Sequence, residues 1–293
     1  MLITIAIIAQ GIKDGLERAV KFMMPGLLFI LIILLLYSIF QGDFLAGVNF
    51  LLKPDFSKIT SQSILAAMGQ AFFTLSLGMG CIVMYGAYLP KNESIVRTTT
   101  TIIFCDTAIA LLAGLVIFPI VFQFGLKPTD GPGLIFLTLP LAFSEIAGGY
   151  LFSSLFFILL SFAAITSALS LLEPSVAWMI ENKNYSRGKS ALIIGFLIWI
   201  LGFLSIFSFN VLSDFTFWKG TLFDNFDYLA SNIMLPLSGL MFTIFASWVM
   251  KSDRSLEELS DVSVNIYRLW RFSARYIAPF GVILVFLNAI GII

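Results

Sequence analysis

Residues Ala67–Tyr88 read AMGQAFFTLSLGMGCIVMYGAY, and this stretch decides the expected fold. It is long and apolar enough to cross a bilayer, yet its centre is poorly suited to a continuous helix. Gly78 and Gly80 lower the helix propensity, and Thr74 and Ser76 place hydroxyl groups just upstream of them. The pattern therefore predicts a helix that breaks inside the membrane.

A break of this kind has two interpretations. Backbone that leaves its helix in hydrocarbon must satisfy its N–H and C=O groups elsewhere, so broken helices persist only against protein or a water-filled cavity. The released carbonyl groups, together with the partial negative charge of a helix C-terminus, suit a cation or an ammonium group. We expect Phe73–Gly80 to form such a binding site. The alternative, which these residues favour when taken alone, is a packing interface where small residues let helices approach.

The composition is that of a helical membrane protein. Hydrophobic residues make up 59% of the 293 residues and charged residues 12%, against about 25% charged residues in soluble domains. The mean hydropathy is +0.99, and several apolar runs are long enough to span a bilayer. We therefore predict an all-α polytopic membrane protein.

The charge balance and the residue types exclude several functions. The 17 basic and 17 acidic residues cancel, so the charge gives no basis for a nucleic-acid partner. The chain has no histidine, which is the commonest metal ligand and general base. Cys81 and Cys105 both lie in apolar runs, where small buried side chains are expected rather than reactive thiols. We find no catalytic constellation and expect no enzyme activity.

The apolar runs predict a single transmembrane domain over residues 1–293. The stub at 1–9 is too short to span and resembles the end of a helix whose beginning is absent. The apolar segment at about 134–147 is also too short and is expected to be re-entrant or interfacial, whereas 41–60 is expected to be a loop. The predicted spans are about 22–40, 63–88, 98–124, 150–180, 190–209, 228–250 and 274–293.

The distribution of positive charges predicts the orientation. With the polar segment Gln10–Lys21 in the cytoplasm and the spans alternating, 13 of the 17 Lys and Arg residues fall on cytoplasmic segments and four on the other side. This skew agrees with the positive-inside rule. We therefore expect a multi-pass protein of the cell inner (plasma) membrane with its C-terminus outside.

Two acidic residues lie well inside predicted spans, where an ionisable group normally faces a cavity or a partner. Asp106, in FCDTA, is a candidate carboxylate ligand or counter-charge for a cation. The alternative is a protonated or hydrogen-bonded structural acid. Glu173 precedes Pro174, whose ring frees a backbone carbonyl, so a structural role explains it as well as a functional one.

Other polar residues also have two interpretations. Ala163–Ser167 (AAITS) offers the adjacent hydroxyl groups of Thr166 and Ser167 on a face of small residues, and oxygen ligands suit a hard alkali cation. Taken alone, these hydroxyl groups are better explained by bonds to their own helix. Asp224 and Asp227 lie three residues apart at the outer start of the sixth span. An acid pair in such a place is usually solvated surface, and the alternative is a role in a gate.

The string GQAFFTLSLGMG resembles the neurotransmitter:sodium symporter family, specifically its bacterial amino-acid transporters. The resemblance covers essentially the whole chain in order. It continues through LLKPDF at 51–56, AGG at 147–149, FAAITS at 162–167 and RYIAP at 275–279. It implies an inverted-repeat transporter fold with a broken midplane helix. It also implies that the chain runs from the end of the family's fourth helix to its eleventh, with the first repeat mostly missing.

The resemblance implies roles for the residues of the break. The carbonyl groups of Phe73, Thr74 and Ser76 would face the substrate ammonium, and Phe73 would also close the outer lid of the pocket. Met79 and Leu171 would supply apolar pocket walls. Gly78 and Gly80 would mark the helix break, and Ser167 would also border the substrate.

The resemblance also implies two sodium sites. Thr74 and Asp106 fall where one site draws its ligands. The Ala163 carbonyl and the hydroxyl groups of Thr166 and Ser167 fall on the other. Relatives commonly have asparagine at the position of Asp106, so a fixed carboxylate there is expected to neutralise sodium and to replace the chloride that some relatives need. Asp227 matches an outer-gate acid.

The function implied is sodium-coupled symport of an apolar or aromatic amino acid by alternating access. The expected partners are the amino acid, the lipid bilayer and the N-terminal helices of the family, which are missing here and would complete the site. The alternative is a truncated, non-transporting membrane protein or a fragment.

Overall fold

The computed structural model describes residues 1–90, 93–126, 128, 131–146, 148–259 and 262–292. Within these ranges the regular secondary structure is helical, apart from one isolated bridge between Phe217 and Gly220. The predicted segment 134–147 and the last predicted span end at Ala147 and Ile293, which lie outside the described residues. Lys91 and Lys127, which entered the charge count, also lie outside them.

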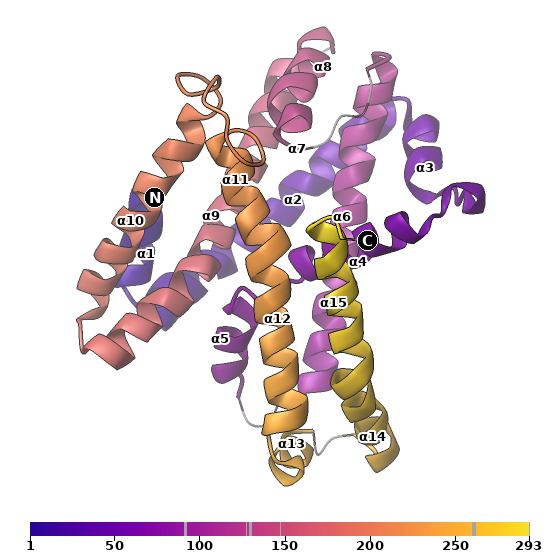
Figure 1. The fold of residues 1–293 in the computed structure, drawn as a ribbon. Helices are drawn as coiled ribbons and strands as arrows, with labels where there is room; N and C mark the ends of the chain where they lie inside the picture. The colour runs from indigo at the N-terminus through magenta and orange to yellow at the C-terminus, as the bar shows by residue number, and fades with distance from the viewer. Residues whose placement is uncertain (91–92, 127, 129–130, 147, 260–261, 293) are drawn as a thin grey trace. The chain divides into compact units, whose positions relative to one another are not determined.

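The helices are ordered along the chain as Figure 1 labels them. The α-helices are α1 (Leu2–Ala9), α2 (Arg18–Gln41), α3 (Phe44–Leu52), α4 (Ser61–Thr74), α5 (Cys81–Ala87), α6 (Ile95–Gln123), α7 (Gly131–Gly133), α8 (Leu139–Glu145), α9 (Gly149–Lys183), α10 (Arg187–Phe207), α11 (Leu222–Asp227), α12 (Leu235–Ile244), α13 (Ser252–Glu258), α14 (Val264–Phe272) and α15 (Ala278–Ala289). π-Helical turns join or extend them at Ile12–Glu17, Leu134–Thr138, Tyr228–Met234, Phe245–Val249 and Ser273–Ile277, and a 3-10 turn covers Phe56–Lys58.

Six continuous helices in the described part of the chain are long and apolar enough to cross a membrane. Several extend beyond the apolar runs that predict them, because a helix needs no hydrocarbon to satisfy its own backbone. The six cover Ile12–Gln41, Ile95–Gln123, Gly149–Lys183, Arg187–Phe207, Leu222–Val249 and Val264–Ala289.

The expectation of a loop over 41–60 was wrong, because this segment contains helix α3. The Asp43 carboxylate caps α3 by accepting the Ala46 N–H at 3.0 Å. Gly47 lets α3 lie directly on α6, since a Cβ there would lie 2.5 Å from Pro119 Cγ. The helix was missed because its nine residues are too few to register as an apolar span.

The chain divides into two compact units, which we describe separately. The first unit comprises residues 1–5, 58–103 and 171–293, and the second comprises residues 6–57 and 104–170. Helices α1, α6 and α9 each contribute residues to both units.

The core of the second unit is apolar and is built by α2, α6, α8 and α9. Its buried members include Leu34, Ile120, Leu139 and Phe156. Phe143 of α8 packs edge-on against the Phe156 ring, with centroids 5.4 Å apart. The short helix α8 is therefore held by protein contacts on its buried face.

A proline within α6 creates a backbone defect that a serine on α2 repairs. Pro119 has no N–H, so the Leu115 carbonyl four residues earlier loses its helical donor. The fully buried Ser38 hydroxyl donates to the Leu115 carbonyl at 3.2 Å and to the Val116 carbonyl at 3.0 Å. The Pro119 carbonyl in turn accepts the Asp43 N–H at 3.0 Å. These bonds tie α2 and the start of α3 to the defect in α6.

Three further prolines directly follow π-helical turns. Pro140, Pro236 and Pro279 each lie two residues after the last residue of such a turn. A wider turn relieves the clash of the proline ring with the preceding carbonyl groups. The long helices therefore continue through these prolines without ending.

The first unit packs α4 against α12 and α15, and α12 against α15 (Figure 1). Small residues make the approach close: a Cβ on Gly239 would lie 2.5 Å from the Phe72 ring, and one on Gly281 would lie 2.9 Å from Met68 Cε. The helix that precedes the break, α4, therefore packs directly against α12 and α15.

The repaired defect in α6 gives a stability test. We expect Ser38→Ala to lower the free energy of unfolding by about 1–3 kcal/mol, because the part-buried Leu115 carbonyl loses its donor. The measurement is the melting temperature of the detergent-purified chain. Ser161→Ala is the matched control, since in the described structure the exposed Ser161 hydroxyl bonds only to the Phe157 carbonyl of its own helix. Equal melting temperatures for the two variants would contradict the role given to Ser38.

Candidate functional site

Helix α4 begins and ends in well-formed caps. Thr60 and Ser63 form a capping box at its start. At its end, the Ser76 N–H donates to the Phe73 carbonyl at 3.0 Å and the Leu77 N–H donates to the Phe72 carbonyl, also at 3.0 Å. These two bonds form a Schellman motif. The sequence thus ends α4 at Thr74 in an ordered way, in the middle of an apolar stretch.

The backbone after α4 is held in left-handed conformations. Ser76 has a φ of 53°, which costs a non-glycine residue about 1–3 kcal/mol. Gly78 and Gly80 follow with φ of 87° and 82°, and Gly80 is the N-cap of α5, which begins at Cys81. The helix is therefore broken, as the sequence predicts.

The break rests directly on α12. The Ser238 hydroxyl donates to the Gly78 carbonyl at 2.7 Å. A Cβ on Gly78 would lie 2.6 Å from the Leu235 carbonyl oxygen, so both its φ and the space require glycine. Ser238 therefore satisfies a carbonyl that no helix satisfies, and it was not singled out in the sequence.

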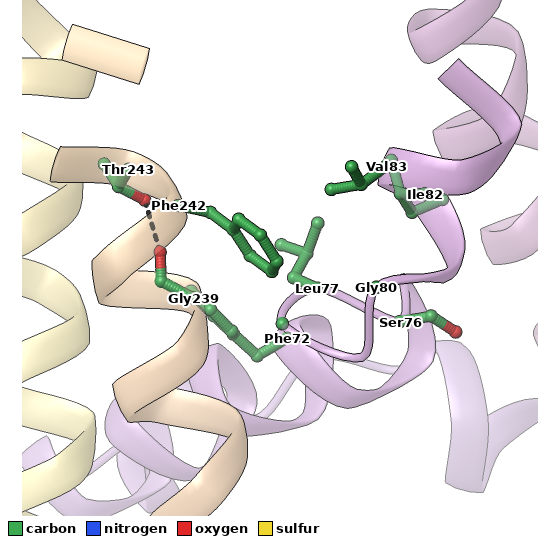
Figure 2. Close-up of a pocket in the computed structure, with 10 residues that line it drawn as sticks. Phe72, Ser76, Leu77, Gly80, Ile82, Val83, Gly239, Phe242 and Thr243 are labelled. Atoms are coloured by element: carbon green, nitrogen blue, oxygen red, sulfur yellow. Dashed lines mark hydrogen bonds between the residues drawn. The ribbon is translucent and has the colours of Figure 1, made fainter. Parts of the chain in front are cut away.

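A cavity of about 160 Å³ lies between the break and α12. Figure 2 shows the Phe242 ring directed from α12 towards Leu77, while the Ser76 hydroxyl points away from both. The cavity is lined by Phe72, Ser76, Leu77, Gly78, Gly80, Ile82, Val83, Gly239, Phe242 and Thr243. Its wall is mostly apolar, as in small-molecule sites.

Only some of the predicted residues of the break line this cavity. Ser76, Gly78 and Gly80 line it, whereas Phe73, Thr74 and Met79 do not. Phe73 is half exposed, at 50%. The α12 residues Gly239, Phe242 and Thr243 were missed because nothing in their local sequence places them against a segment about 160 residues earlier.

The carbonyl groups at the break retain capacity for a ligand. The Phe73 carbonyl accepts the Ser76 N–H, and the Ser76 carbonyl accepts the Met79 N–H at 3.4 Å, a long bond. A carbonyl oxygen has two lone pairs, so one such bond leaves room for a second donor or for a cation. The C-terminal end of α4 adds partial negative charge at the same place.

The end of α9 that belongs to the first unit packs near α5. A Cβ on Gly80 would lie 3.5 Å from Pro174 Cβ, in ordinary contact. The neighbouring Glu173 is buried, and its Oε2 accepts from Arg187 Nη2 of α10 at 2.5 Å. Glu173 Oε1 is also buried and finds no hydrogen-bond donor among the described residues. Leu171, a predicted pocket wall, is exposed at 47%.

The other predicted sodium ligands belong to the second unit. Asp106 is partly exposed on α6. On α9, the Thr166 hydroxyl donates to the carbonyl groups of Phe162 and Ala163, both at 3.0 Å, and Ser167 is exposed. The Thr166 hydroxyl therefore bonds to its own helix, which is the simpler interpretation of this segment from its sequence alone. Its oxygen keeps its lone pairs for a cation.

The two outer acids have different surroundings. Asp224 accepts the Thr221 N–H and hydroxyl, both at 2.8 Å, in a capping box that starts α11. Asp227 is exposed and accepts the Ser231 hydroxyl at 3.0 Å. The buried Asn225 between them donates to the carbonyl groups of Phe217, Gly220 and Thr221. Asp224 and Asn225 thus shape the turn before α11, which leaves Asp227 as the gate candidate.

The sequence is similar to transporters that depend on sodium. An uncharacterized sodium-dependent transporter of Bacillus subtilis (strain 168), YhdH, is 38% identical over 296 residues, which cover 100% of this chain and 66% of that protein. An uncharacterized sodium-dependent transporter of Haemophilus influenzae is 35% identical over 290 residues, which cover 98% of this chain and 63% of that protein.

The fold is similar to a solved structure, that of MhsT in complex with L-phenylalanine. The identity is 42% and the TM-score 0.88, over 98% of this chain and 66% of MhsT. The chain thus spans less than two thirds of the length of these relatives. The predicted all-α transporter fold with a broken helix is confirmed.

The profile of the Sodium:neurotransmitter symporter family matches residues 1–292. The chain therefore belongs to this family, whose members are transporters rather than enzymes.

Proposed function

We propose that this chain carries the broken-helix part of a sodium-coupled symporter for an apolar or aromatic amino acid, working by alternating access in the plasma membrane. The observation that carries the proposal is the ordered break between Thr74 and Cys81, in a chain similar to a transporter solved with L-phenylalanine. The relatives are longer than the matched region, so transport is proposed for the whole protein. The C-terminus is outside, as the positive charges predict.

The substrate ammonium group binds at the break. The carbonyl groups of Phe73, Thr74 and Ser76 accept its N–H groups, helped by the negative end of the α4 dipole. The half-exposed Phe73 side chain is free to cover the bound substrate. Met79, Ser167 and Leu171 border the apolar part of the substrate, and this favours a side chain such as that of phenylalanine.

Sodium binds to oxygen ligands in two places. Thr74 and Asp106 contribute to one site, and the Ala163 carbonyl with the hydroxyl groups of Thr166 and Ser167 contributes to the other. Carbonyl, hydroxyl and carboxylate oxygens are the ligands that hard cations prefer. The inward movement of one charge down a potential of 100 mV releases about 2.3 kcal/mol, which drives uptake. Asp106 replaces the chloride of other members, and Asp227 acts in the outer gate.

Uptake of phenylalanine tests the proposed function. We expect proteoliposomes with an inward sodium gradient to accumulate labelled L-phenylalanine, and accumulation to cease when potassium replaces sodium. The measurement is made on this chain and on a chain extended by any in-frame coding sequence upstream of Met1. Uptake by either form supports the proposal, whereas uptake by neither form, with both folded, favours the non-transporting alternative.

Asp106 gives a test of ion dependence in the transporting form. We expect Asp106→Asn to raise the half-saturating sodium concentration by about tenfold or to make uptake chloride-dependent, because the cation loses a fixed negative charge. Uptake is measured over sodium and chloride titrations. Asp253→Asn, at the exposed start of α13, is the control that should change neither. If the Asp106 variant were indifferent to both ions, the assigned role would be wrong.

Thr166 gives a test of the second sodium site. We expect Thr166→Val to raise the half-saturating sodium concentration by about tenfold or more, since a contact with a charged group contributes about 1.5–3 kcal/mol. Thr100→Val is the matched control, because the exposed Thr100 hydroxyl bonds, among the described residues, only to the Val96 carbonyl of α6. A sodium titration that matches the unmodified protein would leave Thr166 with a purely helical role.

A further inference from the structure

Trp248 and Arg275 contact each other at one end of the two packed helices α12 and α15. Trp248 lies in the π-helical turn that ends the α12 span, and Arg275 lies in the π-helical turn before α15. Trp248 Nε1 donates to the Arg275 carbonyl at 3.2 Å, and Arg275 Cζ lies 4.5 Å from the centroid of the Trp248 ring. The guanidinium group is therefore held over the ring by a cation–π contact.

The positive charge at this place has no acidic partner among the described residues. Among the described residues, no ion pair or hydrogen bond reaches the Arg275 side chain, and its Nε is buried. Within the part of the chain that the structure describes, Arg271, one turn earlier, donates only to neutral groups: the Ser255 and Tyr267 hydroxyl groups and the Met250 carbonyl. The acids of α13 are Asp253, Glu257 and Glu258, and none pairs with either arginine in the described structure. Two like charges four residues apart on one helix repel each other.

The surroundings are those of a membrane interface. Trp248 is the penultimate residue of the α12 span, which ends at Val249. The rings of Phe245, Trp248, Phe272 and Tyr276 are all about half exposed. Trp and Tyr gather where hydrocarbon meets the headgroups, and basic side chains there attract anionic lipids. We call Phe245, Trp248, Arg271, Arg275 and Tyr276 the Arg275 patch.

We propose that the Arg275 patch binds the phosphate group of an anionic phospholipid. The two parallel N–H groups of the Arg275 guanidinium match two phosphate oxygens. The Trp248 ring contacts one face of the guanidinium and so orients it. The exposed aromatic rings would contact the acyl chains of the lipid. A free phosphate ion has no acyl chains, so the rings favour a phospholipid. The lipid neutralises a partly desolvated charge that no acid of the described residues compensates. This proposal rests on the membrane setting and does not depend on the proposed substrate.

The test follows the melting temperature of the full chain in detergent as phosphatidylglycerol or phosphatidylcholine is added. We expect phosphatidylglycerol to raise the melting temperature of the unmodified chain, and phosphatidylcholine to raise it less. Arg275→Gln should need about fivefold more phosphatidylglycerol for half of the effect. This change keeps the Trp248 bond, which is made to the backbone carbonyl. Arg254→Gln, on exposed α13, is the matched control and should respond as the unmodified chain.

Two further measurements separate the charge of Arg275 from its shape, and a phospholipid from a free phosphate ion. Arg275→Lys keeps the charge but loses the fork, and an intermediate response is expected; this variant also serves if Arg275→Gln does not fold. Inorganic phosphate should not reproduce the shift at the same concentration. An equal response of the Arg275 variants and the unmodified chain, an equal loss in Arg254→Gln, or a full shift with inorganic phosphate would each overturn the proposal.

Discussion

Every backbone carbonyl that leaves its helix in the apolar part of this chain must find a donor, and the Ser238 hydroxyl on the Gly78 carbonyl is the bond that meets this requirement at the break. The same rule applies in the second unit, where Pro119 frees a carbonyl and Ser38 supplies the hydroxyl. In both places one helix carries the defect and another carries the repair. The defects therefore bind helices together rather than weaken them.

This arrangement explains how an irregular segment can be ordered enough to bind a ligand. The Schellman motif fixes the end of α4, Gly80 fixes the start of α5, and α12 holds the residues between them. Ser76 in a left-handed conformation is strained, and strain of this kind persists only where the surroundings determine it. A ligand that meets carbonyl groups already held in place loses less of its binding energy to ordering them.

The sequence predicts the break because the residues that cause it are local: Gly78 and Gly80 lower helix propensity within an apolar stretch. It did not predict Ser238 or Phe242, because their pairing with the break depends on tertiary packing across about 160 residues. Helix α3 was missed since its length gives no span signal. The sequence alone leaves Glu173 with two possible roles, because its partner, Arg187, lies on the next helix and is brought to it only by the fold.

The Thr166 bond shows that the two explanations of the AAITS segment are compatible. A hydroxyl that ligates sodium must present its lone pairs to the cation, so its proton needs another acceptor. The carbonyl groups of Phe162 and Ala163 are such acceptors, both at 3.0 Å. Under the proposed function, the bond to the helix therefore orients the Thr166 oxygen for the cation, and helical bonding and sodium binding are two uses of one hydroxyl.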